Sequence, residues 1–196
     1  TLYASGKGAS PEYALNYVLA ENELLDEVTV EWLPEHAACV AALASNPEGI
    51  AMLPQPFVTT AQMQDENLRV ALDLTQAWDD LQSAGVEQPS AMITGVLIGR
   101  REFIEANPDA VDAFLQRYQE SVAFVNGNNA EAAALVGKYD IVPAAVAERA
   151  LPQCNIVYID GAEMREKLGG YLSVLMEQNP ESVGGALPQE DFYYAP

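Results

Sequence analysis

The chain has 196 residues, of which 49% are hydrophobic, so it can bury a core without help from a metal or a disulfide. Its 29 acidic and 9 basic residues give a net charge of −20. Nucleic acid is therefore excluded as an expected partner, because phosphate backbones are bound by clusters of Lys and Arg.

Strands and helices are predicted to alternate in the first half of the chain. Residues 28–33 alternate apolar and polar side chains as a half-buried strand does, and residues 50–53 form the short apolar run of a strand in a parallel sheet. Strands are predicted at 1–4, 28–33, 50–53, 69–74 and 92–99, helices at 11–22, 35–45, 57–63 and from Thr75, and a loop at 83–90. This order predicts an α/β fold with a parallel sheet and right-handed crossovers.

The second half is predicted to be mostly helical, with one strand at residues 156–159. Helices are expected from Pro108 and at 130–138, 143–151 and 161–178. The first has an apolar stripe of Val111, Phe114, Leu115, Tyr118 and Val122, and the last has one of Met164, Leu168, Tyr171 and Leu175. Stripes of this kind need a surface on which to pack.

The corner between the first strand and the first helix is a candidate ligand site. Ser10 and Pro11 are typical of a helix N-cap and first turn, and two glycines precede them. Such a turn can present backbone N–H groups to an anion beside the positive end of a helix dipole. The alternative is that the glycines only allow a sharp turn. The candidate residues are Ser5, Gly6, Lys7, Gly8, Ala9 and Ser10.

A second candidate loop follows the strand predicted at residues 50–53. It contains Gln55, which can both donate and accept hydrogen bonds, and Pro56, which lies near a helix start. Ligands of open α/β sheets bind at the carboxyl ends of the strands, where this loop, the first corner and residues 74–78 are expected to meet. The alternative is that Pro54 and Pro56 only end the strand.

The sequence offers no convincing catalytic or metal-binding set. His36 is the only histidine, and we expect it at the surface because it begins an Ala-rich helix. One His and two distant cysteines, Cys39 and Cys154, do not supply a zinc site. The cysteines are expected to be buried thiols, with a disulfide as the alternative. We therefore expect no cofactor, no metal and no enzymatic activity.

Five segments of the chain resemble, in order, the substrate-binding proteins of bacterial ABC transporters. These segments are ASGKGASPEYALNYVL, LPQPFVTTA, ALDLTQAW, EFIEANPDAVDAFLQRYQESVAFV and QNPESVGGALPQEDFYY. The resemblance is to the nitrate, sulfonate and taurine type, which includes binders of thiamine-precursor pyrimidines, and it covers essentially the whole chain. It implies the type II periplasmic-binding fold, in which two α/β lobes close over a ligand.

The resemblance also implies a division of the chain. Members of the family carry a further N-terminal segment that forms much of the first lobe's sheet. By this comparison, residues 1–94 form the second lobe, and residues 95–196 form the hinge return and the helical C-terminal part of an incomplete first lobe. Apolar surface left by the missing part of that lobe is expected to promote self-association.

The function implied by the resemblance is capture of a small polar or anionic organic solute and its delivery to an ABC permease in the membrane. The family's cleft-facing loops correspond to Ser5–Ser10 and to Gln55 and Pro56. The implied location is extracytoplasmic, as a periplasmic protein or a cell-surface lipoprotein. The alternative is a small-molecule-converting enzyme on the same architecture, because fold does not fix function.

Overall fold

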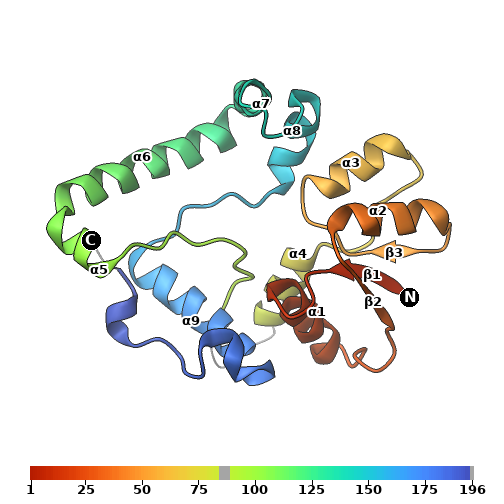
Figure 1. Ribbon diagram of the computed structural model, residues 1–196, viewed down its shortest axis with the longest axis horizontal. Coiled ribbons are helices and arrows are strands. Elements are labelled where there is room, and N and C mark those ends of the chain that lie inside the picture. The colour runs from red at the N-terminus through yellow and green to blue at the C-terminus, as the bar shows by residue number, and fades with distance from the viewer. Residues whose placement is uncertain (84–88, 195–196) are drawn as a thin grey trace.

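The computed structural model describes residues 1–83 and 89–194, and its elements are labelled in Figure 1. The strands are β1 Leu2–Ser5, β2 Val30–Leu33 and β3 Ile50–Ala51. The helices are α1 Ser10–Glu21, α2 His36–Ser45, α3 Phe57–Gln64, α4 Leu74–Ser83, α5 Arg101–Ala106, α6 Pro108–Gly127, α7 Asn129–Lys138, α8 Ala144–Ala150 and α9 Gly161–Gln178. Short 3-10 turns are η1 Leu151–Gln153, η2 Pro180–Val183 and η3 Glu190–Phe192.

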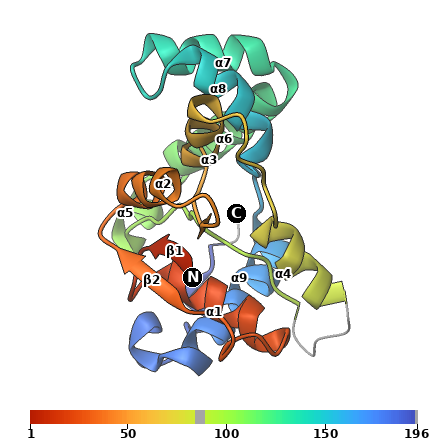
Figure 2. The same ribbon diagram turned by 90° about the vertical axis from the view of Figure 1, so that its right-hand side faces the viewer.

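A small parallel sheet organises the N-terminal part of the chain. β1 lies in the middle and pairs with β2 on one side and β3 on the other. The β3 pairing continues past its assigned end, since the Met52 N–H donates to the Tyr3 carbonyl at 2.8 Å. Helices α1 and α2 lie on opposite sides of this sheet (Figures 1 and 2). The predicted α/β class with a parallel sheet is confirmed.

Three predicted strands are wrong. Residues 69–73, 92–99 and 156–159 have no strand assignment, although they contain the apolar residues that suggested strands. A strand needs a hydrogen-bonded neighbour, and sequence pattern reports only apolar alternation. Several apolar side chains of these segments stay in solvent, with Leu72 63% exposed and Ile98 81% exposed, whereas Met92 and Ile93 pack against the main core. Part of the predicted loop at 83–90, residues 84–88, lies outside the described residues.

The predicted helix caps Ser10 and Thr75 are also wrong, because in each case the capping residue lies one or two positions earlier in the chain. Ala9 is the N-cap of α1 and Ser10 is its first residue, so the Ser10 hydroxyl does not cap the helix. Thr75 lies inside α4, and Asp73 caps this helix by accepting from the Thr75 N–H at 2.8 Å. A carboxylate two residues before the first free N–H groups can reach them, whereas a residue already in the helix cannot. Helix α5 was not predicted.

The main described core joins the N-terminal helices to the C-terminal one. It contains Tyr13, Ala14, Val18, Trp78, Tyr171 and Leu175. The Trp78 side chain is fully buried, with ring centroids 4.4 Å from Tyr17 and 5.5 Å from Tyr171. Its indole N–H donates to Ser90 Oγ at 3.0 Å. The α9 stripe is therefore paired, since Tyr171 and Leu175 pack against α1 and α4.

The stripe on α6 is only partly covered. Val122 is buried, whereas Phe114 and Tyr118 are half-exposed. Figure 1 shows α6 along the outer edge of the molecule, next to α7 and away from the sheet. Tyr118 contacts the ring of Tyr158 at a centroid distance of 6.0 Å. This helix therefore has an apolar face that the described residues leave largely in solvent.

We expect Trp78→Ala to lower the free energy of unfolding by about 3–5 kcal/mol, because the substitution removes a fully buried indole between two helices. Trp78→Phe keeps a ring in the core and loses only the N–H donor to Ser90, so its cost should be about 1–2 kcal/mol. Urea unfolding followed by circular dichroism measures both. Equal losses for the two variants would show that the ring packing contributes little.

Candidate functional site

The glycine corner predicted from the sequence is a tight turn at the carboxyl end of β1. Gly6 and Gly8 have φ angles of +88° and +77°, which side chains rarely adopt. A Cβ on Gly6 would lie 2.9 Å from Pro11 Cγ, whereas a Cβ on Gly8 would meet nothing within 4 Å. Lys7 is exposed. The positive φ angles therefore explain both glycines without a ligand.

The hydrogen bonds of this corner are partly used by the protein itself. The Gly8 N–H donates to Glu12 Oε2 at 2.6 Å, and the Ala9 N–H donates to the Gly6 carbonyl at 3.1 Å. A carboxylate from α1 thus occupies a donor that the sequence interpretation assigned to a ligand. Gly8, Ala9 and Ser10 are exposed. An external anion would have to compete with the Glu12 side chain at Gly8.

Ser5 differs from the rest of the corner because its side chain is buried. Its hydroxyl lies 2.6 Å from His36 Nδ1, and the two groups share a hydrogen bond. The His36 ring in turn packs on the Phe57 ring at a centroid distance of 4.8 Å. His36 is half-buried, so the expectation that it lies free at the surface is wrong. In the sequence, His36 follows Pro34 by two residues, just after the carboxyl end of β2. This position could have indicated that His36 lies beside the candidate loops, which also follow strands.

These groups do not form an accessible nucleophile. Ser5 is only 4% exposed, so a substrate carbonyl has no path to its hydroxyl. Burial raises the pKa of the Cys39 thiol, and a hydrogen bond from Ser5 opposes this effect only in part. A thiol with a raised pKa is a poor nucleophile at neutral pH. Both cysteines are free, with Cys39 buried and Cys154 half-buried.

The second candidate loop holds Gln55 in one orientation. Its Oε1 accepts from the Thr59 hydroxyl at 2.8 Å and from the Thr59 N–H at 3.3 Å. Thr59 is buried in the first turn of α3, where free N–H groups need an acceptor. Gln55 therefore caps α3 from outside the helix. With its oxygen fixed, the amide NH2 group of Gln55 is turned away from Thr59.

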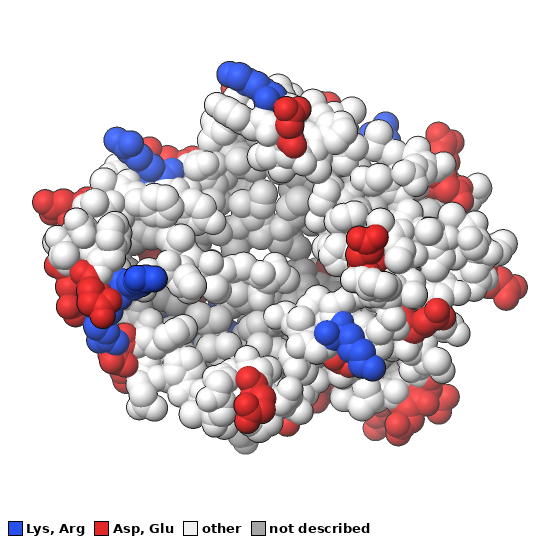
Figure 3. All heavy atoms as spheres, in the orientation of Figure 1, with Lys and Arg blue, Asp and Glu red and all other residues white. Residues whose placement is uncertain are grey.

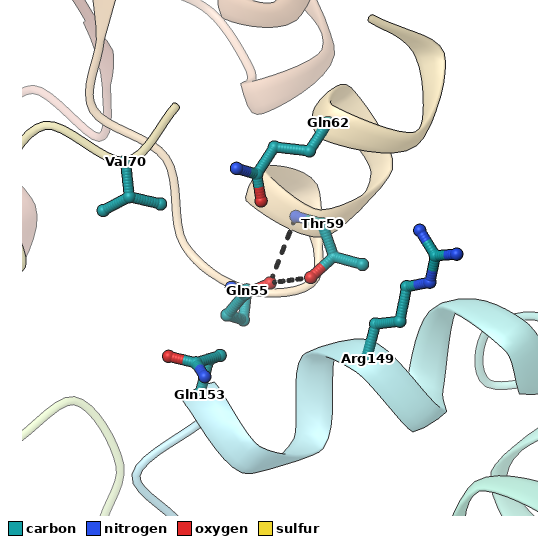
Figure 4. A pocket seen from close by; sticks show the side chains of 6 residues that line it. All are labelled: Gln55, Thr59, Gln62, Val70, Arg149 and Gln153. Carbon is teal, nitrogen blue, oxygen red and sulfur yellow. Dashed lines mark hydrogen bonds between the residues drawn. The ribbon is translucent and has the colours of Figure 1, made fainter. Parts of the chain in front are cut away.

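A cavity of about 340 Å³ lies between α3 on one side and α8 and η1 on the other (Figure 4). We call it the α3–α8 cavity. It is lined by Gln55, Thr59, Gln62, Val70, Arg149 and Gln153. Of the sequence-predicted site residues, the structure thus places Gln55 in the cavity wall and Pro56 beside it. Ser5, Gly6, Lys7, Gly8, Ala9 and Ser10 are not in this wall.

The wall of the α3–α8 cavity combines polar side chains with the apolar Val70, and Arg149 of α8 is its single charged residue. In the part of the chain that the structure describes, no ion pair or hydrogen bond of the Arg149 side chain is found. Sequence reasoning missed Arg149 because it lies far from the candidate loops in the chain. Charged side chains are elsewhere concentrated near the periphery of the face in Figure 3, and the hollowed middle of that face is largely uncharged.

A second cavity of about 500 Å³ lies between α9 and the C-terminal segment. Its wall includes Arg165, Glu166, Glu190 and Tyr193. Arg165 forms an ion pair with Glu190 across it. The arginine in this cavity therefore already has an internal counter-ion, unlike Arg149.

Two further properties concern metals and membranes. Within residues 1–83 and 89–194, no three His, Cys, Asp or Glu side chains come together as a metal site would require. Across the same residues, no helix has both the length and the apolar character needed to span a bilayer.

No family model matches the chain, and no curated protein matches it. Its structure is similar to a solved structure described as an ABC transporter from Parabacteroides distasonis, with a TM-score of 0.76 and 19% sequence identity. The similarity covers 100% of this chain and 66% of that chain, so this chain spans about two thirds of the length of the solved structure. At this identity the similarity shows the fold, and it agrees with the periplasmic-binding-like architecture that the resemblance implied.

The two glycines of the corner form a matched pair for testing its conformation. We expect Gly8→Ala to cost about 1–2 kcal/mol of unfolding free energy, because alanine is strained at positive φ. Gly6→Ala should cost at least about 1 kcal/mol more, because its methyl group also meets the Pro11 ring. Chemical denaturation measures the difference. Equal stability of the two variants would show that Pro11 moves aside freely.

Proposed function

We propose that this chain is part of the solute-binding component of an ABC importer, which captures a small polar or anionic organic solute and delivers it to a membrane permease. The observation that carries the proposal is the α3–α8 cavity, whose polar walls come from a predicted ligand loop and from a helix of the C-terminal half. The described fold is that of a solved ABC transporter structure. We place the whole protein outside the cytoplasm, as a periplasmic protein or a lipoprotein.

We further propose the division suggested by the resemblance. Residues 1–94 would be the second lobe, and residues 95–196 the hinge return and the helical part of the first lobe. The rest of the first-lobe sheet would come from chain outside this sequence. One support is that Val70 and Ile98 lie exposed in segments that have no neighbouring strand. A second support is the similar solved structure, because this chain covers only 66% of it. The nitrate, sulfonate, taurine or thiamine-precursor type remains our preferred subgroup.

The alternative function is an enzyme on the same architecture, and the Ser5–His36 hydrogen bond is the observation that favours it. Three facts weigh against a hydrolytic site there. Ser5 is buried, the Cys39 thiol has a raised pKa, and the described cavity is lined by Gln55 and Arg149 rather than by Ser5. Capture without chemistry is therefore the better-supported function.

We expect the full-length protein, purified from its host, to retain a small molecule that native mass spectrometry detects. Saturation with that molecule at one hundred times its Kd should stabilise the protein by about 2.7 kcal/mol. The molecule should be recovered unchanged after prolonged incubation. Any product, together with its loss in Ser5→Ala, would replace the receptor assignment by the enzyme alternative.

The chain by itself is expected to self-associate through the exposed apolar residues Val96, Leu97 and Ile98, because they form a continuous run in solvent. Ile98→Lys should lower the apparent mass in light scattering by placing a charge in this run. Gln119→Lys on α6 makes the same change of charge at an exposed polar position and should have no effect. A monomeric wild-type chain at high concentration would contradict this expectation.

A further inference from the structure

We infer that the C-terminal turn of the chain is an electrostatic clasp, which fastens the α5 end of the helical half to α9 and is released as ionic strength rises. We call Glu190, Asp191 and Tyr194 the C-terminal clasp. The inference concerns the mobility of the helical half, so it goes beyond the proposed function and does not depend on it.

The clasp joins two helices through two adjacent carboxylates. Glu190 forms an ion pair with Arg165 near the start of α9. Asp191 Oδ2 accepts from Nη2 of Arg101, the first residue of α5, at 2.7 Å, and the Asp191 carbonyl accepts from the same nitrogen at 3.2 Å. Figure 1 shows the C-terminal segment, in dark blue, running from α9 back toward α5. One short turn thus ties α5 to α9.

The clasp uses a large share of the positive charge of this chain. Both long-range ion pairs found within residues 1–83 and 89–194 belong to it, and the third pair found there joins Glu163 to Lys167, one turn apart on α9. The whole chain has 9 basic residues against 29 acidic ones. Without the two arginines, the adjacent carboxylates of Glu190 and Asp191 would repel each other. Pairing with arginine therefore holds the turn in place.

The clasp holds α6 at the end that lies farthest from its other attachments. α6 has 20 residues, so its length is about 30 Å. Near its C-terminal end, beside α7, Asn126 Nδ2 donates to the Ile156 carbonyl at 2.8 Å. Near its N-terminal end, Asp112 Oδ1 accepts from the Tyr194 hydroxyl at 3.2 Å. The clasp thus fixes α5 and the beginning of α6, while α7 and α8 fix the opposite end.

Charge rather than apolar packing holds the clasp. No residue of the turn Glu190–Phe192 is buried, and Phe192 is 55% exposed. A cavity of about 500 Å³ separates the C-terminal segment from small α9 residues such as Ala162 and Gly169. The four side chains of the two ion pairs are each more than half exposed, between 51% and 75%. Salt weakens ion pairs that are exposed to water in this way.

Release of the clasp frees α5 without opening the main core. α9 stays attached because Tyr171 and Leu175 pack in that core with Trp78. Residues 89–100, which lead to α5, have no helix or strand assignment, so they do not hold α5 rigidly. The clasp therefore controls how far α5 and the beginning of α6 move relative to α9.

Hydrogen exchange of the full-length protein, followed by mass spectrometry, tests the clasp. When sodium chloride is raised from about 50 mM to about 500 mM, we expect exchange in peptides covering residues 101–112 and 187–194 to become about fivefold faster. Peptides of α1, which packs in the main core, should not change. Exchange of residues 101–112 that is independent of salt would overturn the inference.

Removal of single charges tests the two ion pairs. Asp191→Asn and Glu190→Gln should each accelerate exchange of residues 101–112 and 187–194 at low salt by about threefold. Glu163→Gln makes the same change of charge in the local pair within α9 and should leave both peptides unchanged. An equal acceleration in all three variants would show that the exchange follows overall charge, which would contradict the clasp.

Reversal of the α5 pair is the sharpest test. Arg101→Glu alone should release α5, because the introduced carboxylate repels Asp191. Arg101→Glu combined with Asp191→Arg restores the pair in the opposite sense, and exchange should return to within about twofold of the wild type. A double variant as mobile as the single one would overturn the inference. Circular dichroism confirms that each variant is folded. None of these positions lines the α3–α8 cavity, so failure of the clasp would leave the proposed function standing.

Discussion

The packing of Trp78 against α1 and α9 is the interaction on which the rest of the structure depends. It fixes the last long helix of the chain to the helices of the sheet region. The intervening helices α6 to α8 meet the sheet region at a second place, where α8 contacts α3. Between these two attachments the chain runs in extended segments, and the α3–α8 cavity lies beside the second attachment. Burial of the aromatic cluster around Trp78 thus holds the two halves of the chain together. The α3–α8 cavity remains between them.

Local sequence patterns correctly predicted the helices with an apolar face and the strands that have a hydrogen-bonded neighbour within this chain. The helices containing Tyr13, Val122 and Tyr171 follow from apolar residues at helical spacing, and the parallel sheet follows from alternation of short strands and helices. The strands expected around Leu72, Ile98 and Val157 are absent because apolar alternation says nothing about whether a neighbouring strand exists. The predicted caps failed because other acceptors lie closer to the free N–H groups. Asp73 accepts from the Thr75 N–H at the start of α4, and the Ala9 carbonyl accepts from the N–H groups of Glu12 and Tyr13 in the first turn of α1.

The candidate site was predictable only where it lies next to a strand. Gln55 was found because it follows a strand at the carboxyl edge, where ligands of α/β sheets bind. Arg149 was not found because no local feature of α8 distinguishes it from an ordinary surface arginine. Its position opposite Gln55 depends on contact between α3 and α8, which are eighty residues apart in the chain at their nearest ends.

The bond between Thr59 and Gln55 gives a buried residue control over which polar group the wall of the α3–α8 cavity presents. Thr59 sets which end of the amide faces outward, although it contributes only part of the wall itself. A side chain at this position without a hydroxyl would leave the backbone N–H of residue 59 as the remaining partner of the Gln55 oxygen, so the amide would be held less firmly. The order of the exposed part of this wall can therefore change through a substitution at its most deeply buried residue, while the exposed side chains stay the same.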